Sequence, residues 1–299
     1  MTDLSIIVVA ADVREEVLEC LASVDRHAGG LAVETILVDN GSRDGTADAV
    51  RRLFPRTKLA RLSRNRGVAA RNHGLRAATG RFRMFLDSDA RVTAGALEEM
   101  VAFMEARPDV GLVGPKLVYP DATLQLSTRR FPPLWLPLVR RPPLERLLGD
   151  GPGVRRHLMA DERHDLPREV EYVLGACQLF SAAAQRTAGE FGRLMFYGPD
   201  DAEWCLRMRT AGYRVMYCPD AVVVHDYRRS TRRRPVSRAA VSQLLTFYHF
   251  QWKWRHERAR LVEEGRAMDA RAATLAAGPP DPASTQGAGG GRATPVEPG

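Results

Sequence analysis

The first third of the chain alternates short β-branched runs with amphipathic stretches, and this alternation restricts the folds that the chain can adopt. Runs typical of buried strands occupy residues 4–9, 33–38, 58–62, 81–86 and 110–114. Helical stretches separate them at residues 14–30, 67–78 and 94–106. Strands that alternate with helices predict an α/β domain whose parallel strands are joined by helical crossovers.

The second half of the chain is less regular. Residues 131–153 are rich in proline and arginine, which predicts an irregular excursion or mobile loop. Residues 171–184 return to an ordered pattern. Residues 197–212 are typical of a helix that begins near Pro199, and residues 221–225 of a strand.

The C-terminal region contains a basic run, a predicted helix with aromatic residues and a tail that is predicted to be unfolded. A basic run lies at residues 228–234, and the last residues are too poor in apolar side chains to fold. A helix predicted between them carries Val241, Leu244, Leu245, Tyr248 and Trp252 on one face. This helix would pack back on the domain, lie on an anionic membrane or bind nucleic acid, and the sequence leaves these alternatives open.

Composition limits the class of protein. The formal net charge is +8, but arginine supplies most of the positive charge, because the chain has only three lysines. The four cysteines, Cys20, Cys177, Cys205 and Cys218, form no disulfide or zinc pattern, which favours a reducing cytosol. No apolar run approaches the roughly 20 residues that span a bilayer. These features predict a cytoplasmic protein, in contact with the inner face of the cell membrane if its C-terminal helix binds lipid.

Polar side chains follow two of the predicted strands. Asp39 comes after the second, and Asp87-Ser88-Asp89 follows the fourth. Ligands of open α/β sheets bind beyond the carboxyl ends of strands, so both acidic sites would face one crevice. In extended chain Asp87 and Asp89 project to the same side, where they would hold a hard divalent cation. The alternative is that Asp87 caps a turn and Asp89 begins the next helix.

An ordered series of motifs resembles the family 2 glycosyltransferases, and most closely their rhamnosyltransferase-like branch. The series comprises LSIIVV (4–9), VDNGSRDGT (38–46), the stretch from NRGVAARN to FLDSDA (65–90), PDVGLVGPKLVYPD (108–121), VLGACQLF (173–180) and FYGPDDAEWCLRMRTAGYRVMYCPDAVVVH (196–225). The resemblance implies the GT-A nucleotide-diphospho-sugar transferase fold, a mixed, mostly parallel central sheet flanked by helices with a C-terminal helical extension.

The resemblance, together with the composition of the C-terminal region, predicts domain boundaries. Residues 1–230 would form the glycosyltransferase domain, with a nucleotide-sugar-binding half at 1–125 and an acceptor half at 126–230. Residues 231–265 would form the helical extension, and residues 266–299 a disordered tail.

The resemblance implies a role for each matching donor-side residue. Asp39, Asp44, Arg71 and Asp87 would bind the donor nucleotide, Arg71 because its planar guanidinium suits a diphosphate or a base edge. Asp89 and Asp87, with His225 as a further ligand, would hold Mg²⁺ or Mn²⁺ at the donor diphosphate. The polar loop that usually follows the first strand is replaced by VVAADVRE, in which Asp12 is the nearest substitute.

On the acceptor side, Asp200 and Asp201 match the family's acidic pair, and Asp201 is our candidate for the general base. The usual Gly-Glu-Asp reads Gly198-Pro199-Asp200-Asp201, so the register of the base between the two aspartates stays open. The motif Gly175, Ala176 and Cys177 would line the acceptor side. Glu203 would make an acceptor or a local structural contact.

The resulting hypothesis is a metal-dependent inverting glycosyltransferase. It would move rhamnose or another hexose from a nucleoside-diphosphate donor to a hydroxyl of a cell-envelope glycan or a polyprenyl-linked saccharide. No G-x-G-x-x-G follows the first strand and no P-loop motif occurs, which disfavours a dinucleotide oxidoreductase and a P-loop NTPase. The remaining alternative is a non-catalytic protein of the same fold that binds nucleic acid or membrane; nucleic acid is not the partner we expect.

Overall fold

The computed structural model describes residues 2–139, 143–192, 196, 198–227, 238–261 and 263. Met1–Arg258 form one compact unit, and Ala259–Gly299 form a second. The predicted basic run at 228–234 and the predicted tail at 266–299 lie outside the described residues.

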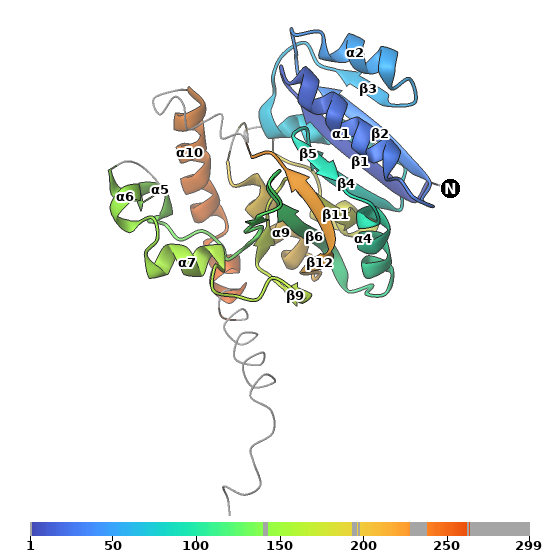
Figure 1. Cartoon of the computed structure of the whole chain (residues 1–299). Helices are drawn as coiled ribbons and strands as arrows, with labels where there is room; N and C mark the ends of the chain where they lie inside the picture. The colour runs from blue at the N-terminus through green and yellow to red at the C-terminus, as the bar shows by residue number, and fades with distance from the viewer. Residues whose placement is uncertain are drawn as a thin grey trace, which may run out of the picture. The chain divides into compact units, whose positions relative to one another are not determined.

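A mixed ten-stranded sheet forms the centre of the first unit (Figure 1). Its main path follows the order β3-β2-β1-β4-β11-β6-β12-β5, with β7 paired to β6 and β9 paired to β12. The strands are β1 (Leu4–Ala10), β2 (Val33–Asp39), β3 (Lys58–Arg61), β4 (Phe82–Asp87), β5 (Ala90–Val92), β6 (Val110–Val118), β7 (Leu124–Gln125), β9 (Arg168–Glu169), β11 (Cys177–Ser181) and β12 (Arg214–His225). Two further strands, β8 (Thr128–Arg129) and β10 (Tyr172–Val173), pair with each other.

The strand directions bring two aspartates and a histidine that are distant in the sequence to one edge of the sheet. β3, β2, β1 and β4 are parallel, and β11 runs antiparallel to both of its neighbours, β4 and β6. β6 therefore has the direction of β4, and β12 is parallel to β6. The carboxyl ends of β2, β4 and β12, at Asp39, Asp87 and His225, consequently lie at the same edge.

Helices cover both faces of the sheet. α1 and α4 contact one face, and α3, α8 and α9 contact the other. The helices are α1 (Arg14–Arg26), α2 (Thr46–Leu53), α3 (Arg71–Ala77), α4 (Ala96–Glu105), α5 (Leu136–Val139), α6 (Leu144–Leu148), α7 (Pro152–Leu158), α8 (Ala182–Ala188), α9 (Asp200–Thr210) and α10 (Arg238–Lys253), with a 3₁₀ turn at Gly67–Ala70 before α3.

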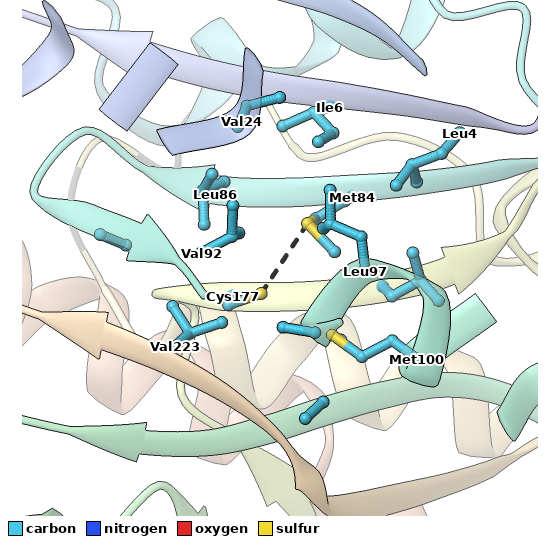
Figure 2. Packing of buried hydrophobic residues seen from close by; sticks show 14 of the residues in the cluster. Leu4, Ile6, Val24, Met84, Leu86, Val92, Leu97, Met100, Cys177 and Val223 are labelled. Atoms are coloured by element: carbon cyan, nitrogen blue, oxygen red, sulfur yellow. Dashed lines mark hydrogen bonds between the residues drawn. The ribbon is translucent and has the colours of Figure 1, made fainter. Parts of the chain in front are cut away.

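The core on the α1 and α4 face is built from alternate strand residues. Leu4 and Ile6 of β1 and Met84 of β4 are fully buried there (Figure 2). Cys177 joins them from β11, with its Sγ 3.8 Å from the Sδ of Met84. Each such apolar side chain contributes roughly 1.5–3 kcal/mol through burial. All four cysteines are buried and free.

An aromatic cluster fixes α9 against the opposite face. Trp204 of α9 is fully buried, and its ring lies 5.6 Å from Phe85 and 4.7 Å from Phe191. Phe180 of β11 completes the cluster, 4.8 Å from Phe85. Aromatic pairs at these separations add about 0.5–1.5 kcal/mol beyond burial. The first turn of α9 is thereby held near the end of β4.

The structure differs from the sequence predictions in two regions. Residues 131–153, predicted as irregular, include α5, α6 and the start of α7. In α10 the predicted apolar face does not pack: Leu245, Tyr248 and Trp252 are exposed, whereas Phe247 and Phe250 are buried. Leu244 is half-buried, and the side chain of Val241 lies outside the described residues.

Candidate active site

Three potential metal ligands converge where β4 and β12 end. Ligand atoms of Asp87, Asp89 and His225 all lie within 4.8 Å of one another. β5 positions them, because Ala90 pairs with His225, and the amide of Asp226 donates a 3.0 Å hydrogen bond to the carbonyl of Asp89. The predicted trio is therefore brought together by backbone pairing.

The electrostatics of this cluster suit a cation. Burial raises the pKa of Asp87, and the neighbouring Asp89 raises it further against the opposing charge of Arg71. Although burial opposes it, the contact with Asp89 raises the pKa of His225, whose Nε2 lies 3.4 Å from Asp89 Oδ1. Two carboxylates and one imidazole form a donor set that Mg²⁺ and Mn²⁺ accept.

Arg71 connects this cluster to the acidic helix. Its Nη2 donates to Asp87 Oδ1 at 3.2 Å and its Nη1 to Asp200 Oδ2 at 2.9 Å. The guanidinium lies over the ring of Phe85, 4.9 Å from the centroid, and the side chain is only 11% exposed. Arg71 is thus fixed by two carboxylates and an aromatic face.

Asp200 and Asp201 are the first two residues of α9, and their environments differ. Asp200 is ion-paired with Arg71, whereas Asp201 accepts a 2.8 Å hydrogen bond from the amide of Ala202. Burial and the charge of Asp200 raise the pKa of Asp201 to about 7. A carboxylate with that pKa changes its charge near neutrality, as a general base requires.

Asp39 is fully buried at the end of β2. Its Oδ1 accepts a 2.9 Å hydrogen bond from the amide of Ser42. Its Oδ2 has no hydrogen-bond partner among the described residues, and the nearest cationic nitrogen, Arg61 Nε, is 3.7 Å away. A buried acceptor without a donor costs about 1–3 kcal/mol, which a bound ligand would offset.

Asp44 and Asp12 are tied into the loops that border the crevice. The carboxylate of Asp44 accepts hydrogen bonds from the Arg14 amide and from Thr46. Despite opposing burial, these bonds lower the pKa of Asp44. Asp12 adopts a left-handed backbone, with φ of 57°, and accepts a hydrogen bond from the Arg43 amide. Both oxygens of Asp44 are therefore engaged in ordering the loops.

The predicted acceptor-side residues do not all reach the site. A Cβ at Gly175 would lie 3.4 Å from the Asp201 Cβ, so Gly175 faces the acidic pair. The Ala176 carbonyl accepts a 2.9 Å hydrogen bond from the Asp87 amide, and the Cys177 side chain lies in the core. Glu203 is buried and paired with Arg207 at 2.7 Å and Lys253 at 3.1 Å, which joins α9 to α10.

One residue at the site gives no signal in the sequence. Gln125 of β7 is buried, and its Oε1 lies 2.7 Å from His225 Nδ1. β7 has only two residues, so neither periodicity nor a motif indicates it.

The chain belongs to glycosyl transferase family 2, whose family model matches residues 5–160. It is 25% identical over 244 residues to N-acetylglucosaminyl-diphospho-decaprenol L-rhamnosyltransferase of Mycobacterium tuberculosis (strain H37Rv), covering 75% of this chain and 77% of that protein. It is 34% identical over 166 residues to pre-mycofactocin glycosyltransferase of the same strain, covering 55% of this chain and 31% of that protein.

Solved structures agree on the fold. A crystal structure of GalNAc-T7 with UDP, GalNAc and Mn²⁺ superposes with a TM-score of 0.59 at 16% identity, covering 76% of this chain and 44% of that one. S. aureus TarS superposes with a TM-score of 0.56 at 17% identity, covering 76% and 37%. The chain thus spans less than half of either structure, and the predicted GT-A fold is confirmed.

The family assignment confirms the predicted activity, inverting transfer of a sugar from a nucleoside-diphosphate donor. It disfavours the alternative of a non-catalytic binding protein. Within the part of the chain that the structure describes, no helix combines the length and apolarity needed to cross a bilayer.

Proposed function

We propose that the chain is a metal-dependent glycosyltransferase in which Asp87, Asp89 and His225 hold Mg²⁺ or Mn²⁺ at the donor diphosphate. The convergence of their ligand atoms within 4.8 Å carries this proposal. When bound, a divalent cation neutralises the negative charge that develops on the departing nucleoside diphosphate. Arg71, which touches Asp87 and Asp200, adds a fixed positive charge between the two groups of acids.

Asp39 would select the nucleotide. Its buried Oδ2 lacks a hydrogen-bond donor among the described residues, and a base N–H or a ribose hydroxyl supplies one. Asp39 and Asp87 end strands that flank β1, so the nucleoside would bind over the carboxyl end of β1. The loops that hold Asp12 and Asp44 follow β1 and β2 and border this position. We therefore assign residues 1–125 to the donor half of the domain and residues 126–230 to the acceptor half.

Asp201 would be the general base that takes the proton from the acceptor hydroxyl. Asp200 is ion-paired with Arg71, whereas Asp201 has a pKa raised to about 7 and lies beside Gly175. These two differences support Asp201 as the base that we propose. Glu203, which is paired with Arg207 and Lys253, would stabilise α9 and its contact with α10.

The proposed donor is a nucleoside-diphosphate deoxyhexose of the rhamnose type, and the proposed acceptor a hydroxyl of a polyprenyl-linked saccharide. The M. tuberculosis relative named above is a rhamnosyltransferase whose name contains N-acetylglucosaminyl-diphospho-decaprenol. That similarity covers 75% of this chain and 77% of the relative at 25% identity.

A panel of nucleotide sugars tests this proposal through thermal stability. We expect a rhamnose donor with Mg²⁺ or Mn²⁺ to raise the melting temperature, because saturation at 100 times Kd adds about 2.7 kcal/mol of stability. Chelation of the metal, or Asp39→Asn, should abolish most of the shift. Asp25→Asn, an exposed change on α1, should preserve it. If no nucleotide sugar stabilises the protein, the proposed donor site is wrong.

The acceptor would be reached at an anionic membrane surface on the inner face of the cell membrane. Large apolar side chains are exposed around α5 and α6, namely Leu134, Trp135, Leu138, Leu144, Leu147 and Leu148. Leu245, Tyr248 and Trp252 form an exposed apolar face on α10. Residues 131–158 contain five arginines against one glutamate and one aspartate, which complements anionic lipid. Amphipathic segments of this composition bind membrane interfaces.

Liposome flotation tests the membrane surface. We expect Leu147→Glu and Trp252→Glu each to weaken binding to anionic vesicles about tenfold, since each removes roughly 1.5 kcal/mol of apolar burial. Leu53→Glu is the control, because Leu53 is also an exposed apolar residue but lies on α2. Binding that is insensitive to the first two changes, or equally sensitive to all three, would contradict the proposed surface.

A further inference from the structure

We propose that Gln125 is a positioning residue that holds His225 in the one neutral tautomer able to bind a metal ion. This inference rests on the metal site proposed above and extends it to a residue outside the acidic motif. The observation behind it is the contact between Gln125 Oε1 and His225 Nδ1 at 2.7 Å.

The contact is built into the sheet. Leu117 of β6 pairs with Gln125 of β7 on one side and with Val223 of β12 on the other, so β6 lies between the two strands that carry Gln125 and His225. Gln125 is 3% exposed and His225 is 4% exposed. Water is therefore excluded from the contact, and the ring depends on Gln125 for its Nδ1 partner. The opposite nitrogen, Nε2, lies 3.4 Å from Asp89 Oδ1.

The chemistry of the two groups fixes the proton. An amide oxygen only accepts hydrogen bonds, so Nδ1 must carry a hydrogen to bond with Gln125 Oε1. A neutral imidazole has one N–H, so a ring that carries its proton on Nδ1 has its lone pair on Nε2, the nitrogen beside Asp89, where a metal ion held by the carboxylates would accept it. A donor group at position 125 would move the proton to Nε2 and block the metal. Histidine ligands of metals are commonly oriented in this manner through their second nitrogen.

No other hydrogen bond of the amide competes with this orientation. Gln125 Nε2 has no hydrogen-bond partner among the described residues, so the bond to His225 is the one that orients the side chain. A purely structural glutamine would be expected to satisfy its buried donor as well as its acceptor. In this arrangement the hydrogen bond to His225 is made, while the Nε2 donor of Gln125 has no partner among the described residues.

Metal affinity in the absence of sugar substrates tests the proposal. We expect Gln125→Leu, which keeps the size but removes the acceptor, to weaken Mn²⁺ binding about 10–100-fold in an electron paramagnetic resonance titration. Gln125→Glu keeps an acceptor and should bind Mn²⁺ at least as tightly as the wild type. The matched control is Gln185→Leu, since Gln185 is a buried, hydrogen-bonded glutamine on α8 outside the site. Its Mn²⁺ affinity should equal that of the wild type.

The tautomer itself gives a readout that a structural role would not change. In ¹⁵N-histidine-labelled, metal-free wild type at alkaline pH, the His225 ring should carry its proton on Nδ1; His225→Asn identifies the signal by its loss. In Gln125→Leu the proton should shift toward Nε2. A wild-type ring protonated on Nε2 would overturn the proposal, even if the leucine variant failed to fold.

The experiment separates this inference from the metal site on which it rests. If wild-type protein binds no Mn²⁺, the metal site is wrong and this inference fails with it. If wild type binds Mn²⁺ and a folded Gln125→Leu binds it with the same affinity, the metal site stands and the role of Gln125 is refuted.

Discussion

Replacing Asp201 by asparagine is expected to lower the turnover of sugar transfer by about 10²–10⁴-fold, the usual contribution of a general base. The amide is nearly the size of the carboxylate, but it cannot take the proton of the acceptor hydroxyl. Donor and metal binding should be retained, because Asp87, Asp89, Arg71 and Asp39 are unchanged. Turnover assays and a Mn²⁺ titration on the same preparation measure the two effects separately.

The pH dependence of the wild type provides a second test of this base. Burial and the charge of Asp200 raise the pKa of Asp201 to about 7, opposed by Arg129 and Arg71, which are the cations that face it. The active form is the carboxylate, so kcat/KM should be constant above pH 7 and fall about tenfold per unit below it. The acidic limb should disappear from the residual activity of Asp201→Asn.

Stability should respond in the opposite direction. A carboxyl with a pKa of about 7 in the folded state and about 3.9 in the unfolded state binds more protons when folded. Wild-type stability should therefore decrease as pH rises from about 4 to 7, and Asp201→Asn should melt at a higher temperature than wild type at pH 8. Asp220→Asn, an exposed change on β12, is the control and should alter neither activity nor this pH dependence. Wild-type turnover by Asp201→Asn would assign the base to another residue.

Much of the fold follows from local sequence patterns. The predicted strands at 4–9, 33–38 and 81–86 agree with β1, β2 and β4 to within a residue or two, because buried parallel strands read as continuous apolar runs. The insertion of antiparallel β11 between β4 and β6 is not encoded locally. It depends on pairing with β4, where Cys177 lies opposite Leu86, 91 positions away, and with β6, where Leu179 lies opposite Val113, 66 positions away. No local window of sequence contains such pairs.

The site residues that belong to a sequence motif could be predicted, whereas those that are brought together only by tertiary contacts could not. Asp87, Asp89 and His225 converge as expected, since parallel strands end at one edge. The pairing of Arg71 with Asp200 joins residues 129 positions apart, and Gln125 lies on a two-residue strand. In α10 the face with Leu245 and Trp252 was predicted as one apolar surface, but Phe247 and Phe250 are the residues that pack. Helical periodicity alone does not tell which of two apolar faces is covered.

Replacing Asp89 by asparagine is expected to remove metal binding and transfer together. The change deletes the carboxylate charge 3.4 Å from His225 Nε2 while keeping the size of the side chain. Loss of a direct ligand should weaken Mn²⁺ by more than the roughly 10–100-fold lost with an indirect partner. Transfer should fall on the order of 10³-fold, because the charge on the departing diphosphate is no longer neutralised. A Mn²⁺ titration and a transfer assay at saturating donor measure both losses.

The Asp89→Asn and Asp201→Asn variants separate the two halves of the site. The first should lose Mn²⁺ affinity, metal-dependent stabilisation by the donor and transfer; the second should lose transfer alone. The backbone contact from Asp226 to the carbonyl of Asp89 remains in asparagine, so β5 stays paired with β12 and the fold should be retained. Asp25→Asn on α1 again serves as the control with wild-type values. If Asp89→Asn bound Mn²⁺ normally, the metal would have to be held elsewhere, and the acids that end β4 would act only on the nucleotide.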